Sequence, residues 1–208
     1  MTEPKLSQTA AAGVGRDAAA LALRGFLGPM LFAHGWNKVA GPGGLKGTAG
    51  WFESLGLRPA AVHARMAAGT EMAAGVGLVL GLANPLPAAA AVGLMTVAAR
   101  TDHRGKGFFV FKGGWEYTGV VAGAAVALAM LGHGRFSLDS LLGRRSDGPA
   151  QALVAVALGG TAAVGLLKAC YRPSEGDVEP GEQGLKVGGV LRRTPSTASG
   201  VAPPDDSR

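Results

Sequence analysis

The sequence predicts an all-α protein, a helical transmembrane bundle with a four-helix core and a fifth span. Three observations lead to this fold class. Hydrophobic residues make up 48% of the 208 residues. Charged residues make up only 16%, whereas a soluble domain carries roughly 25%. The apolar residues are gathered into long blocks, and the basic residues lie in the short segments between those blocks.

Five apolar blocks come close to the roughly 20 residues that a transmembrane helix needs. They cover residues 18–40, 62–82, 86–99, 115–132 and 150–169. The third block is short, and it spans only if the bilayer thins or flanking residues join it. Gly28 and Pro29 are expected to kink the first helix, and Pro149 suits the first turn of the fifth. Residues 48–57 are expected to form a short interfacial helix.

These blocks divide the chain into four parts. We expect an N-terminal polar segment over residues 1–17, a four-helix transmembrane core over 18–142, an extra transmembrane helix over 143–170 and a disordered tail over 171–208. The tail is rich in Gly, Pro, Ser and charge, so it offers little surface to bury. The first block is long for a signal sequence and no clear cleavage site follows it, so we expect it to be retained as a span.

The charge and the cysteine content exclude several classes of function. A net charge of +6 in a soluble protein would suggest nucleic acid. Here the basic residues sit between apolar blocks, so we expect membrane lipids as partners and no nucleic acid. The single cysteine, Cys170, excludes an internal disulfide and CxxC chemistry. The four histidines have no HxxxH-type spacing, so no metal site is predicted, and no cofactor is evident from a motif.

Small residues at a spacing of four occur in two of the predicted spans. The pairs are Gly77 with Gly81 and Gly119 with Gly123. Such pairs allow helix backbones to approach closely in lipid. We expect them to serve packing within one protomer, and a homo-oligomer interface is the alternative.

Polar residues inside the spans indicate a site. Because successive spans alternate in direction, the end of the first, the start of the second and the start of the fourth meet on one side of the membrane. The candidate intramembrane polar site consists of His34, Asn37, Lys38, Glu71 and Glu116. Glu71 lies about 13 Å inside its span at 1.5 Å per residue. An acid at that depth is costly unless it is paired or protonated, so we favour a functional role for it.

Lys38 is the natural partner for Glu71 or Glu116, and all three are expected to form one cluster. For Lys38 with Glu116, a salt bridge that only fixes helix packing is an equally good interpretation, because groups at the rim reach water. His34 shares a helix face with Lys38 and is equally well explained as a satisfied bundle histidine. Arg24 is expected to snorkel toward the opposite side, and we assign it no role.

Four stretches of the sequence, taken in order, carry a family resemblance. They are HGWNK at 34–38 with WFESLGL at 51–57, EMAAGVGLVLGL at 71–82, GGWEY at 113–117 and GHGRFSLD at 132–139. Over about residues 21–142 the chain resembles the DoxX family of small bacterial membrane proteins. The resemblance implies a helical bundle with loops that pack back on it. Lys38, Glu71 and Glu116 fall on motif positions of the family, whereas the fifth span and the tail lie outside its pattern.

The resemblance also bears on function. The family is named for its similarity to a membrane subunit of an archaeal thiosulfate:quinone oxidoreductase, and some bacterial members are associated with oxidative and thiol stress. It therefore implies a redox-linked subunit of the inner (plasma) membrane, multi-pass and without independent catalysis, that works with quinone and with redox partner proteins. Lys38 or His34 would then hydrogen-bond a quinone carbonyl, and Glu71 would move protons. The alternative is a scaffold that recruits partner proteins, and a small transporter is less favoured because no inverted repeat is visible.

The distribution of basic residues predicts the orientation in the membrane. One side carries Lys38, Lys46, Arg58, Arg65, Arg100, Arg104, Lys106, Lys112 and Arg172, and the other carries Lys5, Arg16, Arg135, Arg144 and Arg145. The richer side, with the C-terminus, is expected in the cytoplasm. A reporter that works only in the cytoplasm should therefore be active when fused after Arg208. If a reporter that works only outside the cytoplasm is active at that position, the orientation is the opposite of the predicted one.

Overall fold

The computed structural model describes residues 3–173, with side chains from residue 11 onward. This part of the chain is built of helices without a strand, which confirms the all-α fold class. The helices are α1 (Glu3–Ala40), α2 (Gly44–Ser54), α3 (Ala60–Leu80), α4 (Leu86–Thr101), a 3-10 turn η1 (Val110–Lys112), α5 (Glu116–Leu131), α6 (Leu138–Leu141) and α7 (Pro149–Cys170). The expected disordered tail lies, from residue 174 onward, outside the described residues.

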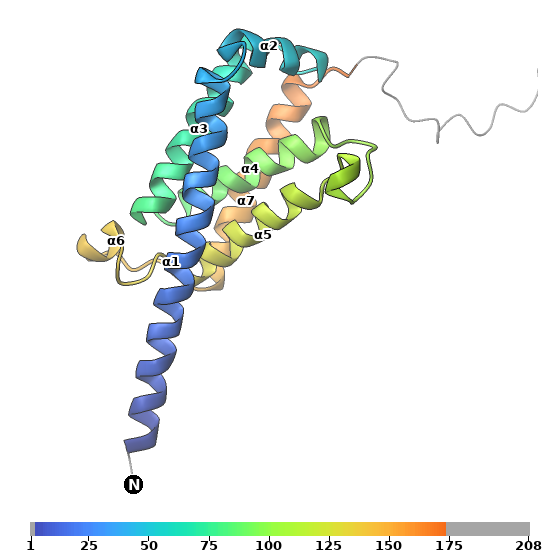
Figure 1. The fold of residues 1–208 in the computed structure, drawn as a ribbon. Coiled ribbons are helices and arrows are strands. Elements are labelled where there is room, and N and C mark those ends of the chain that lie inside the picture. The colour runs from blue at the N-terminus through green and yellow to red at the C-terminus, as the bar shows by residue number, and fades with distance from the viewer. Residues whose placement is uncertain (1–2, 174–208) are drawn as a thin grey trace, which may run out of the picture. The chain divides into compact units, whose positions relative to one another are not determined.

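The first helix is longer than the first apolar block. α1 begins at Glu3, so residues 3–17, which we expected as a separate polar segment, form its opening turns. The same helix continues through Pro29 to Ala40. Its N-terminal end extends past the other helices in Figure 1. Alanines at positions 10–12 and 18–20 favour the extension, because alanine is the strongest helix former.

Among the described helices, α7 alone is both long and apolar enough to cross a membrane. Only 17% of its most apolar stretch is buried inside the protein, which fits a helix that faces lipid better than the core helix of a soluble domain. α4 and α5 are apolar but have 16 residues each. At 1.5 Å per residue they are about 24 Å long, less than the hydrocarbon core of about 30 Å.

The helices pack in two groups. α1 lies along α3, and α2 crosses over the ends of both (Figure 1). α4 packs against α5 and α7, and it also contacts α3, which joins the two groups. The core between them is made mostly of alanines, and its largest fully buried side chains are Leu31, Leu78 and Leu128. Small side chains let the helices come close, so packing in this bundle depends on backbone approach as well as on interdigitated side chains.

Glycines mark the points of closest approach between helices. In α1 against α3, a Cβ on Gly75 would lie 2.6 Å from the carbonyl oxygen of Gly28. In α4 against α7, a Cβ on Gly159 would lie 2.9 Å from the backbone nitrogen of Gly93. Such distances leave no room for a side chain. The GxxxG glycine Gly77 similarly faces Pro87 of the same chain.

Arg24 closes the C-terminal end of α3. It is only 5% exposed. Its guanidinium donates hydrogen bonds to the carbonyl oxygens of Leu78 (2.9 Å) and Val79 (2.7 Å). It also donates to those of His133 (2.9 Å) and Phe136 (2.6 Å). The expectation that Arg24 snorkels away was wrong, because the last carbonyls of α3 lack helical partners and accept its donors.

Asp139 holds the turn between α3 and α4. Its carboxylate accepts hydrogen bonds from the backbone nitrogens of Ala83 (2.9 Å) and Asn84 (3.0 Å). Ala83 has φ +59°, a conformation that is uncommon for a residue other than glycine. Burial alone would raise the pKa of Asp139, but the N–H donors of Asn84 and Ala83 outweigh it and hold that pKa below the ordinary value. The stretch 132–139 therefore holds the C-terminal end of α3 in place, through its carbonyl bonds to Arg24 and through the bonds of Asp139 to the following turn.

The glycine contact between α4 and α7 can be tested with adjacent positions. Gly159→Ala places a methyl group against the backbone of α4 and should destabilise the protein by about 1–3 kcal/mol, the usual cost of overpacking. Gly160→Ala is the matched control, because no atom lies within 4 Å of the added carbon. The control should unfold at or slightly above the wild-type temperature, since alanine favours helix. Equal thermal unfolding midpoints for the two variants in detergent would contradict the contact.

Candidate functional site

A cavity of about 590 Å³ lies among α1, α2, α3, α4, α5 and α7. Its volume is in the range of pockets that hold small organic molecules. Most of its lining is apolar. The polar side chains on its wall are His34, Lys38, His63, Thr70, Glu71, Thr101, Asp102, His103, Tyr117 and Thr118.

Lys38 and Glu71 form an ion pair on this wall. Lys38 Nζ lies 2.6 Å from Oε2 and 2.9 Å from Oε1 of Glu71. The two side chains are 14% and 8% exposed. Lys38 belongs to the last turn of α1, and Glu71 to the middle of α3. Away from water such charges are stable only when they are paired, so the pair fixes the two helices in register.

Close packing of α1 on α3 makes the ion pair reachable. A Cβ on Gly35 would lie 2.7 Å from the carbonyl oxygen of Ala68. Gly35 is one turn before Lys38, and Ala68 is one turn before Glu71. Because Gly35 has no side chain, α1 and α3 lie close enough for the side chains of Lys38 and Glu71 to reach each other. The end of α1 is also held by Thr48, whose hydroxyl donates to the carbonyl oxygen of Lys38 at 3.1 Å.

A second polar contact lies one turn earlier on α1. Tyr117 Oη of α5 is 3.3 Å from Nε2 of His34 and 3.3 Å from the sulfur of Met30. The rings of His34 and Tyr117 have centroids 6.1 Å apart. Both residues line the cavity. The cavity wall thus carries two sets of proton donors and acceptors, one turn apart along α1.

The remaining predicted site residues lie elsewhere. Glu116 Oε2 accepts a hydrogen bond from the backbone nitrogen of Val110 at 2.9 Å, in the loop before α5. Glu116 is the first residue of α5, so its carboxylate finds a local backbone donor and does not join Lys38 in one cluster. Asn37 is exposed on α1, and its side chain lies against Gly41. The structure therefore brings together Lys38 with Glu71, and His34 with Tyr117.

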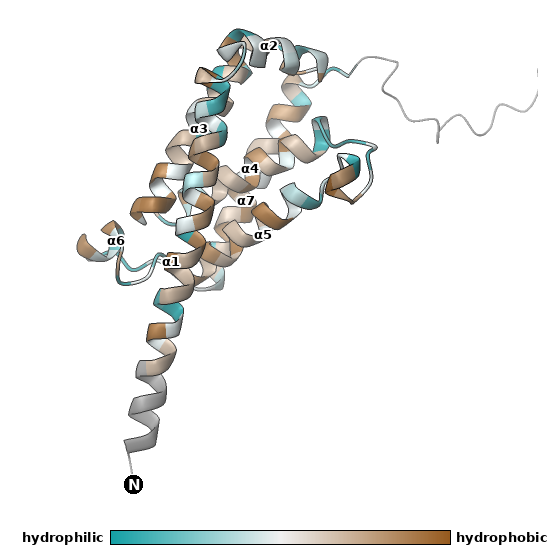
Figure 2. Ribbon diagram, in the orientation of Figure 1, coloured by the Kyte–Doolittle hydropathy of each residue, from teal (hydrophilic) through white to brown (hydrophobic). Residues whose placement is uncertain are grey.

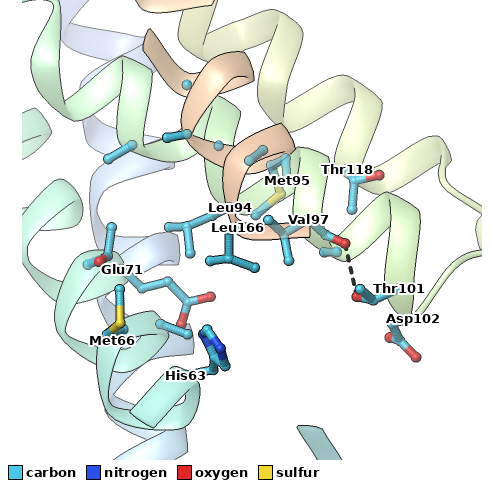
Figure 3. Close-up of a pocket in the computed structure, with 18 of the residues that line it drawn as sticks. His63, Met66, Glu71, Leu94, Met95, Val97, Thr101, Asp102, Thr118 and Leu166 are labelled. Carbon is cyan, nitrogen blue, oxygen red and sulfur yellow. Dashed lines mark hydrogen bonds between the residues drawn. The ribbon is translucent and has the colours of Figure 1, made fainter. Parts of the chain in front are cut away.

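Several lining residues were missed in the sequence. His63 is buried, and its Nε2 lies 3.2 Å from the carbonyl oxygen of Arg58. It precedes Glu71 by eight residues, about two helical turns, and this periodicity was a usable signal. In Figure 3, His63 and Glu71 on α3 face Leu94 on α4 and Leu166 on α7 across the cavity. The sequence does not indicate that α7 lines the cavity, because an apolar span does not reveal which helix it packs against.

Histidines and acids in the described part of the chain do not gather into a metal site. Among residues 3–173, no three His, Cys, Asp or Glu side chains are grouped so that they would hold an ion. The polar groups of the cavity instead form pairs. Such pairs are suited to hydrogen bonding and proton transfer toward an organic molecule.

The coupling between Lys38 and Glu71 can be measured with a double-mutant cycle. Lys38→Met or Glu71→Gln alone leaves the partner charge unpaired, and each should cost about 3–5 kcal/mol in the free energy of unfolding, as for other buried pairs. The double variant should cost clearly less than the sum. The control cycle combines Lys38→Met with Glu116→Gln and should be additive. Additivity in both cycles, measured by unfolding in detergent, would show that Lys38 does not interact with Glu71.

Comparison with known proteins finds a similarity to one family over part of the chain. Residues 19–104 match the family model described as DoxX. None of the curated proteins and none of the solved structures matches the chain. The matched region contains Lys38 and Glu71, whereas Tyr117 and α7 follow it. Over residues 19–104, the part that carries Lys38 and Glu71, the chain is therefore similar to the DoxX family.

Proposed function

We propose that this protein is a redox-linked membrane subunit that binds a quinone in the cavity. The observation that carries the proposal is the largely buried Lys38–Glu71 pair on the wall of a mostly apolar cavity of about 590 Å³. A quinone has a flat apolar ring, carbonyl oxygens and an apolar tail. A polar patch on an otherwise apolar wall matches those features.

The residues of the chain fit the carbonyl end of such a molecule. The ammonium of Lys38 has three N–H donors. It points at both carboxylate oxygens of Glu71, at 2.6 and 2.9 Å. A remaining donor is available for a carbonyl oxygen. Tyr117 and His34, which also line the cavity, offer a hydroxyl and an imidazole for the same purpose.

The opposite wall fits the apolar part. Leu94 and Val97 of α4 and Leu158 and Leu166 of α7 line the cavity without a polar atom in their side chains. When bound, a quinone supplies the acceptor of two electrons and two protons. Lys38 would orient it, and Glu71 would hold or pass a proton at its carboxylate. The electrons would come from a redox partner protein. Both proteins would lie in the inner (plasma) membrane, and this chain would cross it several times.

Quinone binding can be measured with a tryptophan of the cavity itself. Trp51 lines the cavity, so a variant with Trp36→Phe and Trp115→Phe leaves it as the single reporter. In nanodiscs, titration with a short-tailed ubiquinone or menaquinone analogue should quench Trp51 in a saturable manner. Lys38→Gln should weaken binding about tenfold or more, since a hydrogen bond from a charged group is worth about 1.5–3 kcal/mol.

The matched control is Glu116→Gln, whose carboxylate faces the loop and should leave the affinity unchanged. Thermal unfolding of each variant shows that the protein is folded under the conditions of the titration. The proposal also expects quinone in organic extracts of protein purified from native membranes. Absence of saturable quenching, together with co-purified proteins and no quinone, would favour the alternative of a membrane scaffold.

A further inference from the structure

The loop between α4 and α5 exposes an apolar tip. Its side chains are Phe108, Phe109, Val110 and Phe111, and the exposed fractions run from 47% at Phe108 to 77% at Phe111. Trp115, which follows, is also exposed. Figure 2 shows this turn in the hydrophobic colour, with hydrophilic segments beside it.

The tip has a fixed shape. The rings pack on each other, with centroids 5.4 Å apart for Phe108 and Phe109 and 5.0 Å apart for Phe108 and Trp115. Glu116 accepts the backbone N–H of Val110 at 2.9 Å and donates its own backbone N–H to the carbonyl oxygen of Phe108 at 2.9 Å. These contacts hold the rings outward. The loop therefore presents its apolar surface outward.

Basic side chains flank the tip on both sides in sequence. Lys106 precedes it and pairs with Asp102 at 3.3 Å. Lys112 follows it, and its Nζ lies 6.0 Å from the centre of the Phe111 ring. Aromatic rings next to cations are typical of the boundary between lipid headgroups and acyl chains. The positive charge also complements anionic lipid headgroups.

The lengths of the two adjoining helices point the same way. α4 and α5 have 16 residues each, about 24 Å, so they fall short of a hydrocarbon core of about 30 Å. A hairpin this short keeps its tip in the boundary layer of the bilayer and out of bulk water. Aromatic side chains such as those of this tip are enriched at that boundary.

We propose that residues 108–111 insert into the boundary layer of the bilayer, with Lys106 and Lys112 at anionic lipid headgroups. Asp102 and His103, which precede the loop, line the cavity. His103 Nδ1 also lies 2.6 Å from the carbonyl oxygen of Gly113, which ties the loop to the end of α4. Insertion of the tip would therefore place one edge of the cavity at the lipid boundary, whatever the cavity binds.

The insertion can be tested with nitroxide labels, because the chain has a single native cysteine. In a Cys170→Ser background, Phe111→Cys carries the label, and Lys46→Cys on exposed α2 is the control. The protein is placed in vesicles of phosphatidylcholine with phosphatidylglycerol. The label at position 111 should lose collisions with a water-soluble nickel relaxant and gain collisions with oxygen, relative to position 46. Lys112→Gln should reduce this difference in anionic vesicles more than in pure phosphatidylcholine.

A second readout avoids the label at the tip. With Trp36→Phe and Trp51→Phe, fluorescence comes from Trp115, and lipids brominated near the headgroup should quench it. Equal relaxant access at positions 111 and 46, with no quenching of Trp115, would overturn the proposal. Shielding of position 111 that appears only at a high ratio of protein to lipid would also overturn it, because a second copy of the chain would then cover the tip.

Discussion

A charge that is held away from water must find an opposite charge or a set of acceptors, and α1 meets this requirement twice through α3. Arg24 is satisfied by the carbonyl oxygens at the C-terminal end of α3, and Lys38 by Glu71 in its middle. Between these two points Gly28 and Gly35 bring the backbones together. The charges and the close approach depend on each other, since neither Arg24 nor Lys38 would reach its partner across larger side chains.

A second close pair, α4 with α7 at Gly93 and Gly159, has no charge to hold it and depends on packing alone. The cavity lies between the two pairs. Its charged wall comes from α1 and α3, where the pair is fixed, and its apolar wall comes from α4 and α7. The same requirement for partners that locks α1 onto α3 therefore also places a polar patch at the edge of an apolar space, which is the arrangement that a carbonyl-bearing apolar ligand would use.

The sequence predicted much of this fold, because apolar blocks specify helices almost directly. The blocks at 62–82, 115–132 and 150–169 became α3, α5 and α7 with bounds shifted by one or two residues. The sequence offered Glu71 and Glu116 as partners of Lys38, and in the structure Lys38 pairs with Glu71. Glu116 was misplaced because a carboxylate at the start of a helix accepts local backbone N–H groups. Arg24 was misplaced because its acceptors are carbonyls of another helix, and backbone acceptors leave no mark in a sequence.

The two helices of the apolar wall differ in their relation to the DoxX match. The charged wall and α4 lie within the matched residues 19–104, whereas α7 follows them. Replacement of α7 alone would change the width and shape of the cavity while the ion pair stayed intact. The ion pair and the α7 part of the apolar wall are thus encoded in separate stretches of the chain. A mutation or a recombination event can alter one without the other.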